Sequence, residues 1–543
     1  MIMEMELANC RDKWIFNKEY SCWALNDVVY TERAQVPEAQ KLNIFVPKAY
    51  MNEDGSVNTQ GTDNGYTAAT APVIFENNSA GYGQMPSVPL GDFRCYAKQY
   101  LEQGYIYITC GNRGSNSVNS QGVFCGKSPE NLVDIKTAIR FVRHNRKVIP
   151  GDMDKMISVG WSAGGAMSTL VAVTGNNPRF DKYLEKNGAF MDESDSVFAA
   201  QIYCPIVDLE HADLAYEWMF YVDQECEDSP AGPAEVMTPF KRALSIKLRE
   251  KYVQYFNSLN LKSVEKKIPL RFEMGGREGT AYDYFMNKLS ESAGIYLDKL
   301  QKGTAPEKYS VEDYLTGNYS YTIMKMQHPA QQPDAVGGPE PEEAPHDGGP
   351  NGGGPRFKPV PVEVQGNDKT LWLSWDGEHA MVGDLNAYVL SHRRRMKPCT
   401  SFDVLPNTSG ENRVFGTNEM PFMHFCKEIA EAIEELKDQF PEEYETYYQS
   451  YAEQAADEGL KERVFFYNPY SYIGTDEKCD QPEHYRVNVG ARDADTSLSI
   501  SMALACKLGE VYKDVSYNII WDKPHCEADY EGDVIKWIES IVR

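Results

Sequence analysis

The sequence predicts an α/β protein with a mostly parallel sheet and one large insertion. Three observations predict this fold class: apolar strand-like runs alternate with helical patterns in the first third, the alternation stops after Asp208, and it resumes at residue 483. At 543 residues the chain also exceeds what one hydrophobic core usually fills. We therefore expect residues 1–208 and 483–543 to form one core domain, and residues 209–482 to form an inserted cap, or lid, domain.

The core elements follow from short apolar runs that begin or end near Pro or Gly, as buried strands do. Between the third and fourth runs, apolar residues recur at helical spacing, with Ser128 as the predicted N-cap and Pro129 at the first helical position. Strand, helix, strand is the pattern of a parallel sheet covered by helices. The predicted strands span 41–47, 71–76, 105–110 and 156–160, with a further apolar run at 197–207.

The middle of the chain predicts amphipathic helices and aromatic-rich loops, including a long helix at 423–440. Residues 329–359 contain 7 Gly and 8 Pro, which predicts a mobile loop because such a composition buries little. The sheet pattern then returns. It predicts strands at 485–490 and 515–521, a helix between them at 497–508 and a closing helix at 534–541.

Composition narrows the function classes. Fifty-four basic against 80 acidic residues give a formal net charge of −26, which disfavours nucleic acid and anionic membranes as partners. No run approaches the roughly 18 apolar residues of a membrane span, and the N-terminus lacks the features of a signal peptide. We therefore expect a cytoplasmic protein, with a secreted protein whose leader was removed as the alternative. The 12 Cys form no C-x-x-C pair, and no zinc-protease or nucleotide-binding motif occurs, so we expect no metal and no cofactor.

The most informative motif is Gly160-Trp161-Ser162-Ala163-Gly164, a G-x-S-x-G pattern between a predicted strand and a predicted helix. This is the nucleophile elbow of the α/β-hydrolase fold, whose tight turn exposes the serine above the sheet. A small-residue helix cap is the structural alternative. The elbow predicts Ser162 as a catalytic nucleophile.

A serine nucleophile needs a histidine base and an acid, which follow it in the chain in this fold. His525 comes just past the last predicted strand, at the sheet edge where active sites of parallel sheets lie, and the other eight histidines are placed less suitably. Asp493 follows the penultimate strand and is the predicted acid, with Asp208 as the competitor. The predicted catalytic triad is Ser162, Asp493 and His525.

An oxyanion hole requires backbone N–H donors from the residue after the serine and from a loop after an early strand. Ala163 is the first predicted donor. Gly81, in the glycine-containing stretch 75–83, is the second, and a plain turn is the alternative reading of that stretch.

Together, the elbow Gly-Trp-Ser-Ala-Gly-Gly, the block Arg492-Asp493-Ala494-Asp495-Thr496-Ser497 and the Pro524-His525 pair resemble bacterial tannases, which are related to feruloyl esterases. The segments 396–398 and 410–416 also look like motifs of that family, so the resemblance runs through most of the chain. It implies hydrolysis of galloyl esters of polyphenols, with Lys397, Glu411 and Asp495 holding the three ring hydroxyls. Without the resemblance, Lys397 and Glu411 would be read as a surface ion pair.

The chain departs from the fungal relatives at the elbow. Those relatives place a Cys before the nucleophile and another after the His, whereas Trp161 precedes Ser162 here and only Cys526 is present. Three functions stay open: a galloyl esterase, a feruloyl or general carboxylesterase with the same triad, and a non-catalytic binding module. The expected partner is a small polyphenol ester, and the sequence does not indicate an oligomeric state.

Overall fold

The computed structural model describes residues 1–221, 237–327, 358–365, 372–391 and 395–543. Its centre is a nine-stranded sheet in the order β1-β2-β3-β7-β6-β8-β9-β14-β15. The strands from β7 to β15 pair in parallel, and β1, β2, β3 and β7 pair antiparallel. The strands are β1 (Ile15–Asn17), β2 (Cys22–Val29), β3 (Lys41–Pro47), β6 (Pro72–Asn77), β7 (Ile106–Cys110), β8 (Asp152–Trp161), β9 (Ala199–Tyr203), β14 (His484–Gly490) and β15 (Asp514–Ile520).

The sheet has the mostly parallel arrangement of the α/β-hydrolase fold, as the sequence predicts. Strands β6 and β7 are buried along their whole length, which explains their unbroken apolar character. Each predicted strand coincides with an observed strand to within a few residues. The antiparallel strands β1 and β2 were not predicted, and a small separate pair, β4 (Thr62–Asp63) and β5 (Tyr66–Thr67), lies between β3 and β6 in the chain.

Helices join the parallel strands. They are α1 (Ala97–Leu101), α2 (Glu130–His144), α3 (Ala163–Val173), α4 (Asp181–Asn187), α14 (Leu498–Val511) and the closing α15 (Asp533–Val542). The prediction that Ser128 caps α2 is wrong. The helix begins at Glu130 with Pro129 as its N-cap, and the Ser128 hydroxyl instead donates to the carbonyl of Arg463, 2.7 Å away, which lies far along the chain.

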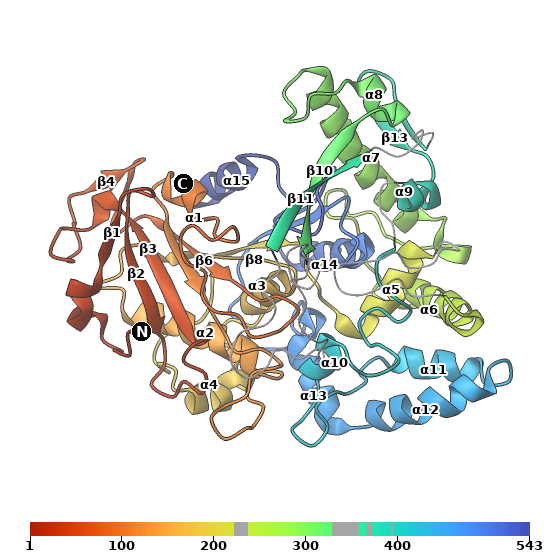
Figure 1. Cartoon of the computed structure of the whole chain (residues 1–543), viewed down its shortest axis with the longest axis horizontal. Coiled ribbons are helices and arrows are strands. Elements are labelled where there is room, and N and C mark those ends of the chain that lie inside the picture. The colour runs from red at the N-terminus through yellow and green to blue at the C-terminus, as the bar shows by residue number, and fades with distance from the viewer. Residues whose placement is uncertain (222–236, 328–357, 366–371, 392–394) are drawn as a thin grey trace, which may run out of the picture.

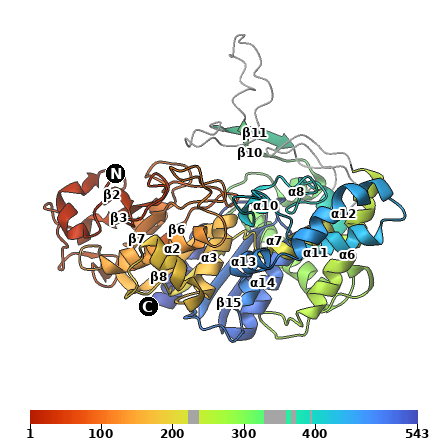
Figure 2. The ribbon, with the colours of Figure 1, turned by 90° about the horizontal axis from the view of Figure 1, so that it is seen from below.

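Between β9 and β14 the chain builds a mainly helical region that lies away from β1 to β4 (Figure 1). After a 90° turn, the antiparallel hairpin β10–β11 is seen along the upper edge of this region (Figure 2). Its elements are α5 (Leu209–Phe220), α6 (Pro239–Ser258), α7 (Thr280–Gln301), α8 (Val311–Thr316), β10 (Ser320–Gln327), β11 (Lys358–Gln365), β12 (Leu373–Trp375), β13 (Ala380–Val382), α9 (Leu385–Ser391), α10 (Gly410–Val414), α11 (Lys427–Glu435), α12 (Pro441–Ala455) and α13 (Glu458–Tyr467).

The helix predicted at 423–440 is shorter and spans only Lys427–Glu435. Before its start, the carboxylate of Asp403 accepts the backbone N–H groups of Phe425 (2.7 Å) and Cys426 (2.8 Å), which therefore lie outside α11. Nearly all of the predicted Gly/Pro-rich loop at 329–359 lies outside the described residues. Within the described residues, no helix has both the length and the apolarity that a membrane crossing needs.

Candidate active site

Ser162 occupies a strained turn between β8 and α3. Its φ of 61° lies in the left-handed region that non-glycine residues rarely adopt. A Cβ on Gly160 would lie 2.3 Å from the carbonyl oxygen of Gly164, and a Cβ on Gly164 would lie 2.4 Å from the carbonyl oxygen of Asn77. Both glycines are therefore required by close backbone contacts, as the elbow motif predicts.

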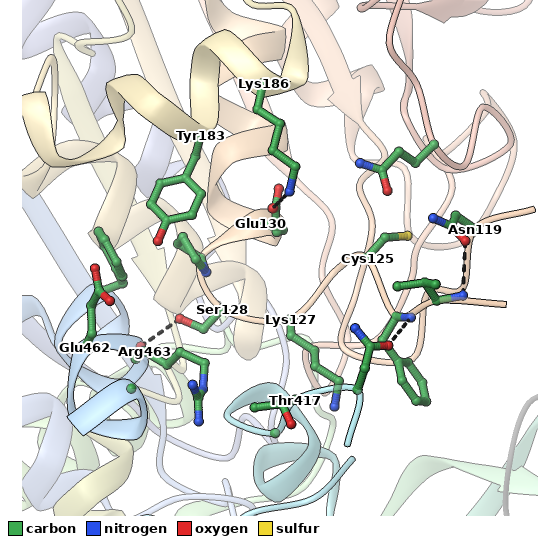
Figure 3. Close-up of a pocket in the computed structure, with 18 of the residues that line it drawn as sticks. Asn119, Cys125, Lys127, Ser128, Glu130, Tyr183, Lys186, Thr417, Glu462 and Arg463 are labelled. Carbon is green, nitrogen blue, oxygen red and sulfur yellow. Dashed lines mark hydrogen bonds and ion pairs between the residues drawn. The ribbon is translucent and has the colours of Figure 1, made fainter. Parts of the chain in front are cut away.

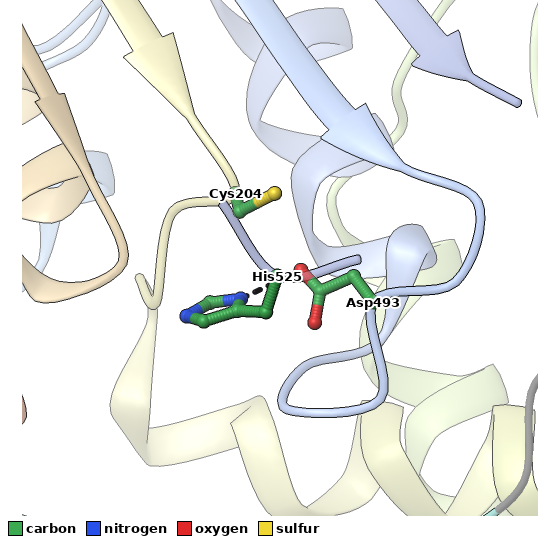
Figure 4. Close-up of side chains that lie close together, drawn as sticks. All are labelled: Cys204, Asp493 and His525. Carbon is green, nitrogen blue, oxygen red and sulfur yellow. Dashed lines mark hydrogen bonds and ion pairs between the residues drawn. The ribbon is translucent and has the colours of Figure 1, made fainter. Parts of the chain in front are cut away.

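His525 and Asp493 face one another on the loops after β15 and β14 (Figure 4). Nδ1 of the imidazole lies 2.9 Å from Oδ2 of Asp493, whose other oxygen accepts the backbone N–H of Asp495 at 2.9 Å. Burial alone would lower the pKa of His525, but the charges of Asp493 and Asp495 outweigh it and raise that pKa well above its ordinary value. The pairing leaves Nε2 as the ring nitrogen that can act as a base.

The competing acid, Asp208, lies in a different cluster. Its carboxylate contacts Nδ1 of His211 at 2.7 Å and accepts the hydroxyl of Tyr255 at 2.5 Å. The acid that contacts His525 is therefore Asp493.

The elbow and the His–Asp pair meet over the end of β9. Ser162 donates its N–H to the carbonyl of Tyr203 at 3.1 Å, and the ring of Trp161 lies edge-on to the His525 ring at 5.8 Å between centroids. Among the hydrogen bonds of the described residues, none joins Ser162 Oγ directly to the imidazole. The structure thus brings the three predicted triad residues to one edge of the sheet, with the Asp–His contact formed.

Cys204, which the sequence did not single out, lies against this pair (Figure 4). Ligand atoms of Cys204, Asp493 and His525 all lie within 4.8 Å of one another, and the Cys204 sulfur accepts the N–H of Gly490 at 3.4 Å. These are metal-ligand types, but a thiol binds metals as the thiolate. Burial raises the pKa of Cys204 to about 12, so the thiol is protonated at neutral pH.

The loop after β6 packs against the start of α3. The N–H of Gly164 donates to the carbonyl of Ser79 at 3.0 Å. Ala163 is the first residue of α3, so its N–H has no intrahelical acceptor. Gly81 lies two residues further along, and its carbonyl oxygen is 3.0 Å from the point where a Cβ on Gly410 would stand. Ser79 contacts the elbow directly, and Gly81 borders α10.

The predicted ring-binding residues interact electrostatically: the charges of Lys397 and Asp495 both act on Glu411, and the charge of Asp495 also acts on His525. Lys397 Nζ stands 4.0 Å above the Phe402 ring, and Asp495 is held by its hydrogen bond to Asp493. Burial raises the pKa of Glu411, the charge of Asp495 raises it further, and the charge of Lys397 opposes both effects. In the described part of the chain, no ion pair within 4.0 Å joins Lys397 to Glu411, so the surface ion pair considered for them is not formed.

A cavity of about 560 Å³ lies between the loop at 119–130 and the segments 416–419 and 459–466 (Figure 3). Lys127 lines this cavity and donates to the carbonyls of Arg413 (3.2 Å) and Pro421 (2.5 Å). Burial, together with the charges of Arg413 and Arg463, lowers the pKa of Lys127 to about 7. None of the predicted triad residues lines this cavity.

The fold and the elbow define the class of the chain: it is an α/β-hydrolase. The family model BD-FAE matches residues 89–219, which include the elbow. Two curated proteins of Mycobacterium tuberculosis also match. The probable carboxylic ester hydrolase LipM is 38% identical over 117 residues (22% of this chain and 25% of the relative), and the esterase LipQ is 33% identical over 91 residues (17% and 20%). The matched part spans about a quarter or less of these relatives.

Solved structures match over almost the whole chain. Tannin acyl hydrolase from Lactobacillus plantarum has a TM-score of 0.74 and 28% identity, with 99% of this chain and 100% of that chain covered. A tannin acyl hydrolase in complex with ethyl gallate has a TM-score of 0.72 and 27% identity, covering 96% and 94%. Tannase from Fusobacterium nucleatum, at 24% identity, a TM-score of 0.69 and coverage of 96% and 95%, shows the fold alone. The comparisons support a carboxylic ester hydrolase whose structure resembles bacterial tannases.

Proposed function

We propose that this protein is a serine esterase that hydrolyses galloyl esters of polyphenols and releases gallate. In this proposal Nε2 of His525 takes the Ser162 proton while Asp493 holds Nδ1, and Ser162 Oγ attacks the ester carbonyl. The oxyanion accepts hydrogen bonds from the N–H of Ala163 and from the loop that contains Gly81. His525 then gives its proton to the departing alkoxide, and water hydrolyses the acyl-enzyme through the same steps.

One observation carries the choice of acyl group. Asp495 connects the proposed triad with the proposed ring-binding residues. Its N–H donates to Asp493, and its charge raises the pKa values of both His525 and Glu411. A ring bound between Lys397, Glu411 and Asp495 would therefore adjoin the triad. Carboxylates can accept from phenolic hydroxyls and a Lys can donate to them, which suits a trihydroxylated ring. The likeness to a tannin acyl hydrolase crystallised with ethyl gallate supports the same choice.

The test compares methyl gallate, methyl ferulate and methyl benzoate as substrates. We expect the highest kcat/KM for methyl gallate, because removal of the ring hydroxyls leaves the polar groups of the site without partners. Faster cleavage of methyl ferulate would instead favour a feruloyl or general carboxylesterase. The two esterase relatives support that function as well as they support a galloyl esterase. Ser162→Ala should abolish cleavage of all three esters, and unchanged rates would refute the triad.

The ring contacts are tested by Lys397→Ala and Glu411→Gln. Each should lower kcat/KM for methyl gallate by roughly 10- to 100-fold, with a much smaller effect on an ester whose acyl ring has no hydroxyl. Equal losses on both substrates would assign these residues to folding instead of ring recognition.

We also propose that residues 209–482 act as the lid of this site, because they supply two of the three ring-binding residues.

A further inference from the structure

Helix α5 carries a stripe of buried polar side chains on one face. Asp213, Tyr216 and Glu217 are spaced by three and four residues, so they lie on neighbouring turns of the same face, and none of the three is exposed to solvent. Polar groups buried in this way need hydrogen-bond partners. Their partners lie in the segments that carry the proposed ring-binding residues.

The Tyr216 hydroxyl joins two distant segments. It accepts the N–H groups of Met396 (3.1 Å) and Lys397 (3.0 Å), and it donates to the carbonyl of Ala494 (3.0 Å). One donated and two accepted bonds use the full capacity of a phenol. A single oxygen atom therefore fixes the backbone of Lys397 relative to the loop that holds Asp493 and Asp495.

Glu217 fixes the other side of Lys397 through Arg395. The Glu217 carboxylate accepts two bonds from the Arg395 guanidinium, at 2.7 and 2.5 Å, and both side chains are buried. Nε of Arg395 donates to the carbonyl of Lys397 at 2.9 Å. Both backbone polar groups of Lys397 are thus bonded to side chains that α5 holds, which leaves its ammonium to the site.

Asp213 supports the third ring-binding residue. Its carboxylate accepts three consecutive backbone N–H groups of residues 401–403, at 2.5, 2.9 and 2.9 Å. Oδ1 of Asp403 in turn accepts the side-chain amide of Asn412 at 2.7 Å, and Asn412 follows Glu411 on α10. Hydrogen bonds made by side chains of α5, directly or through Arg395 and Asp403, therefore hold the segments that carry all three proposed ring-binding residues.

We propose that Tyr216 is a positioning residue that couples recognition of the acyl ring to the catalytic loop, with Asp213 and Glu217 as its supports on α5. This inference rests on the proposed galloyl esterase function. Tyr216 does not contact the reacting atoms in this scheme; it sets the distance between the Lys397 ammonium and the Asp493–Asp495 loop. Loss of its hydroxyl should consequently impair substrates in proportion to their use of ring hydroxyls.

The test is Tyr216→Phe, which keeps the ring and removes the three hydrogen bonds. We expect kcat/KM for methyl gallate to fall by roughly 10- to 100-fold, since misplacement by fractions of an ångström is costly at a polar site. The rate for 4-nitrophenyl benzoate, whose acyl ring has no hydroxyl, should change by less than about threefold. Tyr50→Phe is the matched control, because the buried Tyr50 hydroxyl donates to the carbonyl of Gly104, 2.9 Å away, outside the site. It should leave the ratio of the two rates unchanged.

A double-mutant cycle separates positioning from general destabilisation. If Tyr216 acts through Lys397, the losses of Tyr216→Phe and Lys397→Ala on methyl gallate will not add, whereas independent effects will add. Should Tyr216→Phe fail to fold, Arg395→Lys tests the other side of Lys397, because it keeps a cation opposite Glu217 and removes the Nε donor. The same selective loss on methyl gallate is expected.

The outcomes distinguish this inference from the proposed function. A parent enzyme that does not prefer methyl gallate to hydroxyl-free esters would contradict the proposed function itself. A parent enzyme that does prefer it, combined with equal losses on both substrates, no loss, or additive losses in the cycle, would overturn the role of Tyr216 alone.

Discussion

Gly164→Ala is the sharpest test of the elbow geometry. A Cβ at this position would stand 2.4 Å from the carbonyl oxygen of Asn77 and 3.4 Å from the N–H nitrogen of Ser79. Real Cβ contacts essentially never fall below 3.0 Å, so α3 and the end of β6 at Asn77 must separate by at least about 0.6 Å. Ser79, two residues after the end of β6, accepts the N–H of Gly164 at 3.0 Å, so the separation displaces one wall of the proposed oxyanion hole.

The expected magnitude follows from that displacement. Shifts approaching 1 Å at a catalytic site cost roughly 100-fold, and loss of one oxyanion donor costs roughly 100- to 1,000-fold, so we expect kcat to fall by about 10- to 100-fold. Overpacking should also lower the free energy of unfolding by about 1–3 kcal/mol. Steady-state kinetics on methyl gallate and thermal unfolding measure the two effects.

The matched control is Gly294→Ala on α7. Its Cβ would make only ordinary contacts, the nearest at 3.6 Å, so the change should be neutral or stabilise the helix by up to about 1 kcal/mol without an effect on kcat. If the Gly164→Ala variant had a kcat within about threefold of the parent and unfolded at the parental temperature, this result would refute the close contact between the elbow and Asn77.

Two further predictions concern charged groups. Asp493→Asn should lower kcat by roughly 1,000- to 10,000-fold. It should also move the acidic limb of the pH–kcat/KM profile to lower pH, because Asp493 raises the pKa of His525. Asp208→Asn should lower kcat by less than tenfold, and a larger loss for Asp208→Asn than for Asp493→Asn would refute the assignment of the acid. Burial lowers the pKa of His211, but the charges of Asp208 and Glu428 outweigh this effect and raise that pKa to about 8 from 6.5. Protonation of His211 therefore contributes up to about 2 kcal/mol to the free energy of unfolding. This contribution is complete below pH 6 and is lost as the pH rises through 8. Urea unfolding midpoints between pH 6 and 9 should show this loss in the parent and not in His211→Gln.

The sequence predicted those features of the fold that depend on local pattern. Strands such as β6 and β8 are marked by short apolar runs, and the elbow by its two glycines, because the conformation there depends on neighbouring residues. The failed prediction for Ser128 has the opposite cause. Its hydroxyl finds a partner in Arg463, 335 residues away, and no local pattern reports such a contact.

The same distinction between local pattern and distant contacts explains which residues of the candidate site could be predicted. Asp493 and His525 were predicted because their loops follow strands whose order the fold fixes. Cys204 was missed, since a single buried cysteine after a strand carries no signal of its own. The polar stripe of α5 was missed because Asp213 and Tyr216 occur in what reads as an ordinary amphipathic helix, and only the tertiary structure shows that their face is buried.

The position of α5 connects the inserted helical region to the elbow at Ser162. The chain that leaves β9 donates the N–H of Ile206 to the carbonyl of Ser162 at 3.2 Å, and the Ile206 carbonyl accepts the hydroxyl of Tyr82 at 2.5 Å. The turn of α5 begins three residues later, at Leu209. One short segment therefore binds the backbone of Ser162 and leads into the helix whose polar face positions the proposed ring-binding residues. A displacement of α5 should therefore alter the recognition of the acyl ring and the geometry of Ser162 together.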